Sequence, residues 1–109
     1  MYKMPESDWK YMRKIEKELL NELCTRINKR AMIILEDQNS TEHEKYLSLY
    51  KHTVDSDKTV ARCFNDWSRS TLLPRLYSIN TNDLLTEEHL QNLSEKTRDL
   101  LKNLQKEGN

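Results

Sequence analysis

Residues 41–73 constrain the fold more than any other part of the chain. At 100° per residue this stretch separates into an apolar side and a charged side, the pattern of a long helix with one face packed and one in water. The apolar side holds Tyr46, Tyr50, Thr53, Val54, Val60, Ala61, Phe64, Trp67 and Thr71. Such a helix needs a second apolar stripe to pack against.

The N-terminal third of the chain supplies that stripe. Apolar residues recur there at spacings of three, four or seven: Met12, Ile15, Leu19, Leu23, Ile27 and Ile34. This periodicity predicts a helix over 8–36, with Ser7 as its cap. A polar break at 37–40 follows, and Thr41 and Glu44 fit the capping box of a second helix. So short a connection predicts an antiparallel helical hairpin.

The rest of the chain predicts shorter elements. The second helix is expected over 42–73, because Pro74 lacks the N–H that a helix interior requires. A loop is expected at 78–83, followed by short helices over 87–93 and 95–105. No segment sustains the period-two alternation of a half-buried strand.

The predicted fold class is therefore all-α. A long antiparallel helical hairpin, closed by one or two short C-terminal helices, forms a small helical bundle that dimerisation would complete. The whole chain, 1–109, is expected to be one domain, because 109 residues support one core. Residues 1–6 are expected to be a loose lead-in.

Composition excludes several function classes. The only glycine is Gly108, so a P-loop, a dinucleotide-binding turn and a nucleophile elbow are absent. Lys+Arg and Asp+Glu both total 18, and this balance disfavours a nucleic-acid partner. The longest apolar run, 31–35, is too short for a membrane span. Cys24 and Cys63 form no CxxC, which favours reduced thiols and a cytoplasmic location.

No metal, cofactor or catalytic site is predicted. The histidines His43, His52 and His89 lack the E-x-x-H spacing of di-iron bundles. The segment that starts at His43 begins like H-E-x-x-H, but Leu47 stands where the second zinc-binding histidine is required. No nucleophile lies in a recognisable constellation with a base, so we expect a non-enzymatic protein.

Asp57 lies near the middle of the apolar side of the second helix, which leaves three alternatives. The helix breaks near 55–57 and a new segment is capped there, or Asp57 is buried and paired, or it faces a water-filled pocket. In the paired alternative, a hairpin that turns at 38–41 aligns residues whose numbers sum to about 79, so Arg26 lies opposite Thr53. The Arg26 side chain then reaches the level of Asp57, because helical side chains lean toward their own N-terminus. We then expect an Arg26–Asp57 ion pair.

The same register defines a candidate buried polar or ligand group on the facing sides of the two long helices. Within it, Arg30 is expected to bond to Tyr46 or Tyr50. The group consists of Glu16, Arg26, Arg30 and Asp57.

The sequence holds more apolar residues than the seam of one hairpin can bury, and the excess predicts a surface that packs against a partner. The candidate interaction surface consists of Arg62, Trp67, Arg69, Leu72, Leu73, Arg75 and Leu76. The favoured function is a protein–protein interaction or regulatory module, whose partner is another protein or a second copy, with no membrane involved. The alternative is a regulator that binds a small ligand or nucleic acid through the charged group between the long helices.

Overall fold

The computed structural model describes residues 2–107; Met1 of the predicted lead-in and Gly108 lie outside this range. Within the range every regular element is a helix, which confirms the predicted all-α class. The elements are α1 (Glu6–Leu35), α2 (Glu42–Phe64), the 3-10 turn η1 (Arg69–Thr71), α3 (Leu72–Thr81), α4 (Glu87–Gln91) and α5 (Glu95–Glu107).

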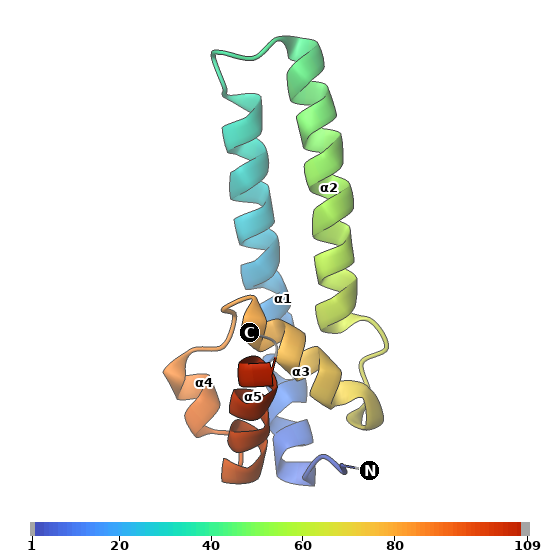
Figure 1. Cartoon of the computed structure of the whole chain (residues 1–109), viewed down its shortest axis with the longest axis vertical. Helices are drawn as coiled ribbons and strands as arrows, with labels where there is room; N and C mark the ends of the chain where they lie inside the picture. Colours follow the sequence, from blue (N-terminus) through green and yellow to red (C-terminus); the bar gives the residue numbers. More distant parts are fainter. Residues whose placement is uncertain (1, 108–109) are drawn as a thin grey trace.

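The molecule consists of a base and a projecting arm (Figure 1). The helices α1 and α2 run antiparallel, as the sequence predicts, and continue well beyond the part that α3, α4 and α5 surround. The resulting shape measures 51 × 29 × 25 Å. We call residues 24–62 the arm and the other described residues the base.

The hydrophobic core lies entirely in the base. In residues 24–62, all of which the structure describes, no side chain is buried. The predicted stripe of the first helix is therefore buried only in its first half. The buried apolar side chains are Met4, Met12, Ile15, Leu19, Leu23, Cys63, Phe64, Leu72, Leu76, Ile79, Leu84, Leu93 and Leu101.

Residues 2–5 belong to the base and are not a loose lead-in. Met4 is buried in the core. The Tyr2 hydroxyl shares a hydrogen bond with Thr97 Oγ1 at 2.6 Å, and Arg69 Nε donates to the Met4 carbonyl at 2.8 Å. Contacts with distant residues thus hold the chain in place before α1 begins.

Asp8 ties the start of α1 to the start of α5. Its carboxylate is 1% exposed and accepts from the Ser94 N–H at 2.8 Å, the Ser94 hydroxyl at 2.7 Å and the Thr97 hydroxyl at 2.6 Å. The buried carboxylate is therefore satisfied on both oxygens. Pro5 occupies the N-cap position of α1 with no side-chain cap, so the predicted cap at Ser7 is wrong.

α2 ends at Phe64, well before residue 73, where the predicted helix ends. Asn65 takes an extended backbone conformation and Asp66 a left-handed one, with φ 53°. Asp adopts the left-handed conformation more readily than most residues, so Asp66 suits the position that follows the end of the helix. Arg75 Nε then donates to the Asn65 carbonyl at 2.6 Å.

Pro74 lies near the start of a helix, not after the end of one. It is the third residue of α3 (Leu72–Thr81), where the backbone N–H has no intrahelical partner and proline is tolerated. α3 continues to Thr81, through most of the loop predicted at 78–83. Its side chains Leu72, Leu76 and Ile79 are fully buried.

The two C-terminal helices lie close to their predicted ranges. α4 (Glu87–Gln91) starts at the predicted residue and ends before residue 93, and α5 (Glu95–Glu107) continues slightly beyond residue 105. Thr86 caps α4 by accepting from the His89 N–H at 3.1 Å.

We expect Asp8→Ala to lower the free energy of unfolding by roughly 2–4 kcal/mol, because two donors of half-buried Ser94 and one of buried Thr97 lose a charged acceptor. Urea denaturation followed by circular dichroism measures the change. The matched control is Asp57→Ala, another helical aspartate that is exposed and should change stability by less than about 0.5 kcal/mol. Equal effects of the two substitutions would contradict the tethering role of Asp8.

Candidate functional site

The arm has the register that the sequence predicts. His52 Nε2 lies 2.9 Å from the carbonyl oxygen of Ile27, and the predicted hairpin places these two residues at the same level. The Ser56 hydroxyl lies 3.5 Å from His52 Nδ1 on the other side of the ring. Polar groups thus occupy part of the seam between α1 and α2.

Local hydrogen bonds close the tip of the arm. Glu44 N–H donates to Thr41 Oγ1 at 3.1 Å and Thr41 N–H donates to Glu44 Oε1 at 2.8 Å, which confirms the predicted capping box. Asp37 accepts from the Ser40 hydroxyl at 2.7 Å and the Asn39 N–H at 2.9 Å. These donors lower the pKa of both the Asp37 and the Glu44 carboxyl groups, so both stay ionised near neutral pH.

α2 turns a different face toward α1 than the sequence predicts. Its half-buried positions are Lys45, Leu49, His52, Ser56, Thr59, Val60 and Ala61. Tyr46 and Tyr50, which were predicted to face inward, are 65% and 66% exposed. A seam of two helices covers only a narrow stripe of each, and α3 to α5 pack around the base. No third layer therefore covers the two rings.

Among the described residues, large apolar side chains are exposed only on the arm: Met32, Ile33, Leu35, Tyr46, Leu47, Tyr50 and Val54. Helical spacing and the observed seam place Met32, Leu35, Tyr46 and Tyr50 on one side of the hairpin. We call these four residues the tyrosine face. Leu47 and Val54 lie along its outer edge on α2.

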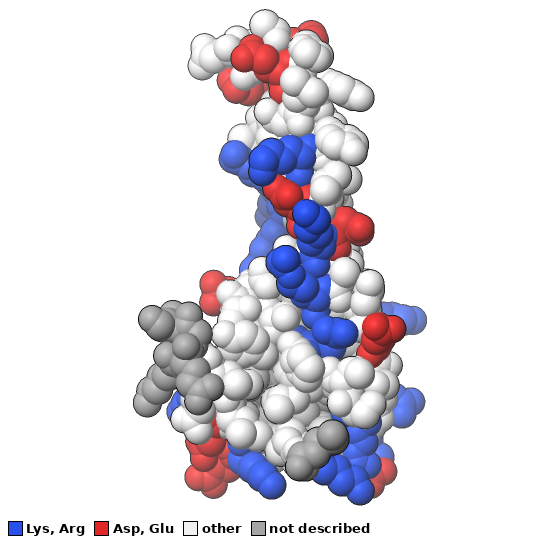
Figure 2. All heavy atoms as spheres, turned by 45° about the vertical axis from the view of Figure 1, so that its right-hand side comes forward, with Lys and Arg blue, Asp and Glu red and all other residues white. Residues whose placement is uncertain are grey.

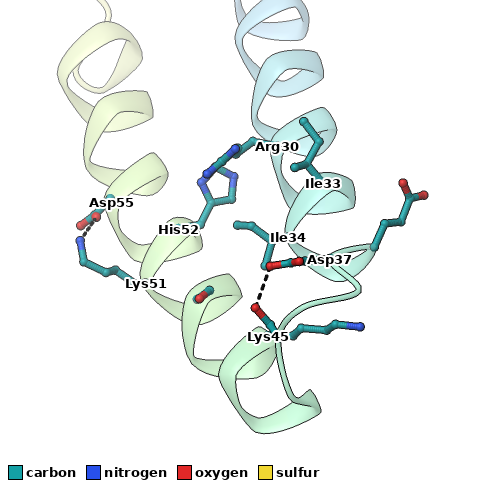
Figure 3. Close-up of a pocket in the computed structure, with 11 residues that line it drawn as sticks. Arg30, Ile33, Ile34, Asp37, Lys45, Lys51, His52 and Asp55 are labelled. Atoms are coloured by element: carbon teal, nitrogen blue, oxygen red, sulfur yellow. Dashed lines mark hydrogen bonds and ion pairs between the residues drawn. The ribbon is translucent and has the colours of Figure 1, made fainter.

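A groove of about 780 Å³ lies on the opposite side of the arm (Figure 3). Figure 3 shows Arg30 of α1 reaching toward His52 of α2, and Lys51 paired with Asp55 at 2.9 Å. The groove is open, and its cations are balanced by carboxylates, so its charges favour neither an anion nor a cation. The lining residues are Arg30, Ile33, Ile34, Glu36, Asp37, Ser40, Lys45, Ser48, Lys51, His52 and Asp55.

The predicted Arg26–Asp57 pair is wrong. α2 is continuous through 55–57, and Asp57 is exposed on the side of α2 that carries the tyrosines. Arg26 instead donates from Nη1 to the Asn82 carbonyl at 2.9 Å and from Nη2 to the Asp83 carbonyl at 3.0 Å. Arg26 thus supplies hydrogen-bond donors to two carbonyl groups at the end of α3, where a helix leaves carbonyls unpaired.

The other members of the predicted polar group also lie apart. Arg30 lines the groove, whereas Tyr46 and Tyr50 face the other side, so the predicted bond between them is not formed. Glu16 is half-buried in the base. The structure therefore does not bring Glu16, Arg26, Arg30 and Asp57 together into one site.

The apolar part of the predicted interaction surface belongs largely to the core. Leu72 and Leu76 are fully buried, and Leu73 packs against the core. Trp67 lies between α2 and η1, with its ring 5.8 Å from Phe64 and 6.3 Å from Trp9 between centroids. These side chains are used within the chain because α3 folds back on α1 and α2.

The arginines of that predicted surface mostly have structural roles. Arg69 donates to the Met4 carbonyl, and Arg75 donates to the carbonyls of Asn65 at 2.6 Å and Arg62 at 3.3 Å. The Arg62 side chain is exposed. Apart from Arg62, the predicted surface therefore lies on the base, whereas the exposed large apolar residues lie on the arm.

Comparison of the chain with protein-family models, curated proteins and solved structures gives no match. In residues 2–107 no helix combines the length and apolarity needed to cross a bilayer. Within the same residues, no three His, Cys, Asp or Glu side chains gather in a way that could hold a metal ion.

We expect Arg26→Ala to lower the free energy of unfolding by about 1–2 kcal/mol, because two carbonyls lose a charged donor. Asp57→Ala should change it by less than about 0.5 kcal/mol, and the double variant should equal the sum of the two within the same margin. A double-mutant cycle by urea denaturation measures this coupling. A coupling of more than about 1 kcal/mol would restore the predicted pair.

We also expect amide hydrogen exchange to differ along α1. In dilute protein, amides of residues 28–34 should exchange at least about tenfold faster than those of residues 12–23, because only residues 12–23 pack on the core. Mass spectrometry of peptides from these two segments measures the difference. Uniform protection along α1 would show that the arm is as stable as the base.

Proposed function

We propose that this protein is a non-enzymatic protein–protein interaction module that self-associates through its arm. One observation carries the proposal: the arm holds no buried side chain, yet it holds every large apolar side chain that is exposed among the described residues. A partner that covers the arm would supply the packing that the chain does not.

The energetics of the arm support this function. Isolated helices of about 12–15 residues are marginal in water, and helices in proteins are stabilised chiefly by packing of an apolar face. The seam of the arm includes the polar residues Ser56 and His52, and within the arm only Ile27 and Val60 pack against the core of the base. Burial of the tyrosine face against another chain would therefore stabilise the arm itself.

The exposed area is large enough for an interface. Six large apolar side chains, exposed by between 37% and 66%, form the tyrosine face and its outer edge, whereas Ile33 lines the groove on the opposite side. Together they expose on the order of several hundred Å², the size of the largest apolar patches on monomers, which are often functional. A standard interface takes about 800 Å² from each partner, and tyrosines often dominate its binding energy.

The cysteines support a non-enzymatic role in a reducing, cytoplasmic setting. Cys24 and Cys63 are both free, and Cys63 is fully buried. Burial raises the pKa of the Cys63 thiol, which keeps it protonated and poorly nucleophilic.

The test is the oligomeric state as a function of concentration. We expect the wild-type protein to dimerise in sedimentation equilibrium, and Tyr46→Glu combined with Tyr50→Glu to raise the dimer Kd at least about tenfold. Because both tyrosines are exposed, the variant should keep its helical content and the melting temperature of its base.

The matched control is Lys17→Glu, an exposed position on the base that changes the net charge by the same amount. This variant should dimerise like the wild type. A wild-type protein that stays monomeric up to millimolar concentration would contradict self-association. Equal weakening by the control would show that net charge, and not the tyrosine face, governs the association.

A further inference from the structure

We propose that the groove of the arm binds an amphipathic helix of another protein. An acidic side chain of that helix lies at Arg30, and a basic side chain two turns away lies at Glu36 and Asp37. The groove is on the opposite side of the arm from the tyrosine face, so this inference does not depend on the proposed self-association.

Two of the cations that line the groove are already neutralised on α2. Lys51 Nζ lies 2.9 Å from Asp55 Oδ2, and Lys45 Nζ lies 3.2 Å from Glu42 Oε1. These pairs leave little net charge for a ligand to meet. The charges that select a ligand are therefore those without such a partner.

Three lining residues take part in no ion pair among the described residues: Arg30, Glu36 and Asp37. The cation lies toward the base and the two carboxylates lie at the tip. At 1.5 Å per residue, Arg30 and Asp37 are roughly 10 Å apart along the arm. Figure 2 shows the same order, with Asp and Glu side chains gathered at the end of the arm and Lys and Arg side chains below them. A matching ligand carries both charges, about 10 Å apart.

Apolar side chains lie between these charges. Ile33 and Ile34 follow Arg30 by three and four residues, about one helical turn. Ile33 is 58% exposed, and Ile34 is half-buried. Figure 3 shows Ile34 directed toward α2. The centre of a matching ligand is therefore apolar.

A helix fits this pattern better than an extended peptide. The backbone groups within α1 and α2 are bonded inside their own helices, so an extended chain in the groove would find no backbone partners. A helix satisfies its own backbone and presents residues i, i+3, i+4 and i+7 along one face. Residues i and i+7 are also roughly 10 Å apart, which is the separation of the charges in the groove.

The base already has a helix on this side of the hairpin. Arg26 of α1 donates to the Asn82 and Asp83 carbonyls at the end of α3, and Arg75 of α3 donates to the Arg62 carbonyl of α2 at 3.3 Å. Helical spacing places Arg26 and Arg62 on the groove side of their helices. In the base α3 therefore forms a third layer on the hairpin, and a helix in the groove would continue that layer toward the tip.

Three labelled peptides test the charge pattern by fluorescence anisotropy at low salt. Each is an alanine-based helix on the order of 20 residues, a length that is partly helical in water, with Leu at i+3 and i+4. One peptide carries Glu at i and Lys at i+7, one carries Glu at both positions, and one carries Lys at both. We expect the wild-type protein to bind the mixed peptide with a Kd about fivefold lower than that of either like-charged peptide.

Arg30→Glu makes the charges that lack partners acidic at both ends of the groove. This variant should prefer the peptide with two Lys residues over the mixed peptide, because preference follows the charges of the site. The matched control is Lys29→Glu, an exposed neighbour with the same change of charge that lies outside the groove lining, and it should keep the wild-type preference. Far-UV circular dichroism of both variants checks that the helices are retained.

Several outcomes would overturn the inference. These are a wild-type protein that binds none of the peptides up to millimolar concentration, one that prefers a like-charged peptide, and an Arg30→Glu variant with an unchanged preference. Binding that disappears in the Tyr46→Glu and Tyr50→Glu double variant would place the peptide on the tyrosine face and would also overturn it. A wild type that binds the mixed peptide but stays monomeric would contradict self-association alone, because the two surfaces lie on opposite sides of the arm.

Discussion

The structure depends on the continuity of α1, a single helix that spans both the base and the arm. Its first half buries Met12, Ile15, Leu19 and Leu23 in the core, and these contacts fix the direction in which its second half leaves the base. Helix propagation adds one hydrogen bond per residue at little further cost once the helix is nucleated. A well-packed base can therefore support a projecting arm in which no side chain is buried.

Charged groups that close helix ends and connect distant segments hold the base together. Asp8 accepts from donors at the start of α5, and Arg26 and Arg75 donate to carbonyls at the ends of α3 and α2. Helix termini leave backbone donors and acceptors unpaired, and a buried or half-buried terminus needs a side chain to satisfy them. Two of these residues, Arg26 and Arg75, were predicted from the sequence to belong to binding sites, but in the structure they connect segments of the base.

Local signals in the sequence predicted the helices, the hairpin register and the Thr41 capping box, because these depend on periodicity and cap chemistry over a few residues. Longer-range features were not predictable in this way. Proline can either follow the end of a helix or lie in the first turn of a new one, so the sequence around Pro74 allows both positions. Only the packing of Leu72 and Leu76 in the core decides between the two. The partners of Arg26 lie at Asn82 and Asp83, a contact that no spacing rule encodes.

The misassigned face of α2 is the most informative of these differences. Hydropathy predicted that Tyr46 and Tyr50 face α1, yet His52 and Ser56 lie in the seam, and the more apolar side is exposed. Asp57 creates a conflict only if that side packs against α1; on an exposed side it is an ordinary solvated carboxylate. If the arm acted alone, the opposite rotation of α2 would bury more apolar area and be preferred. The observed rotation places His52 and Ser56 in the seam and leaves Tyr46 and Tyr50 exposed at the surface of the arm.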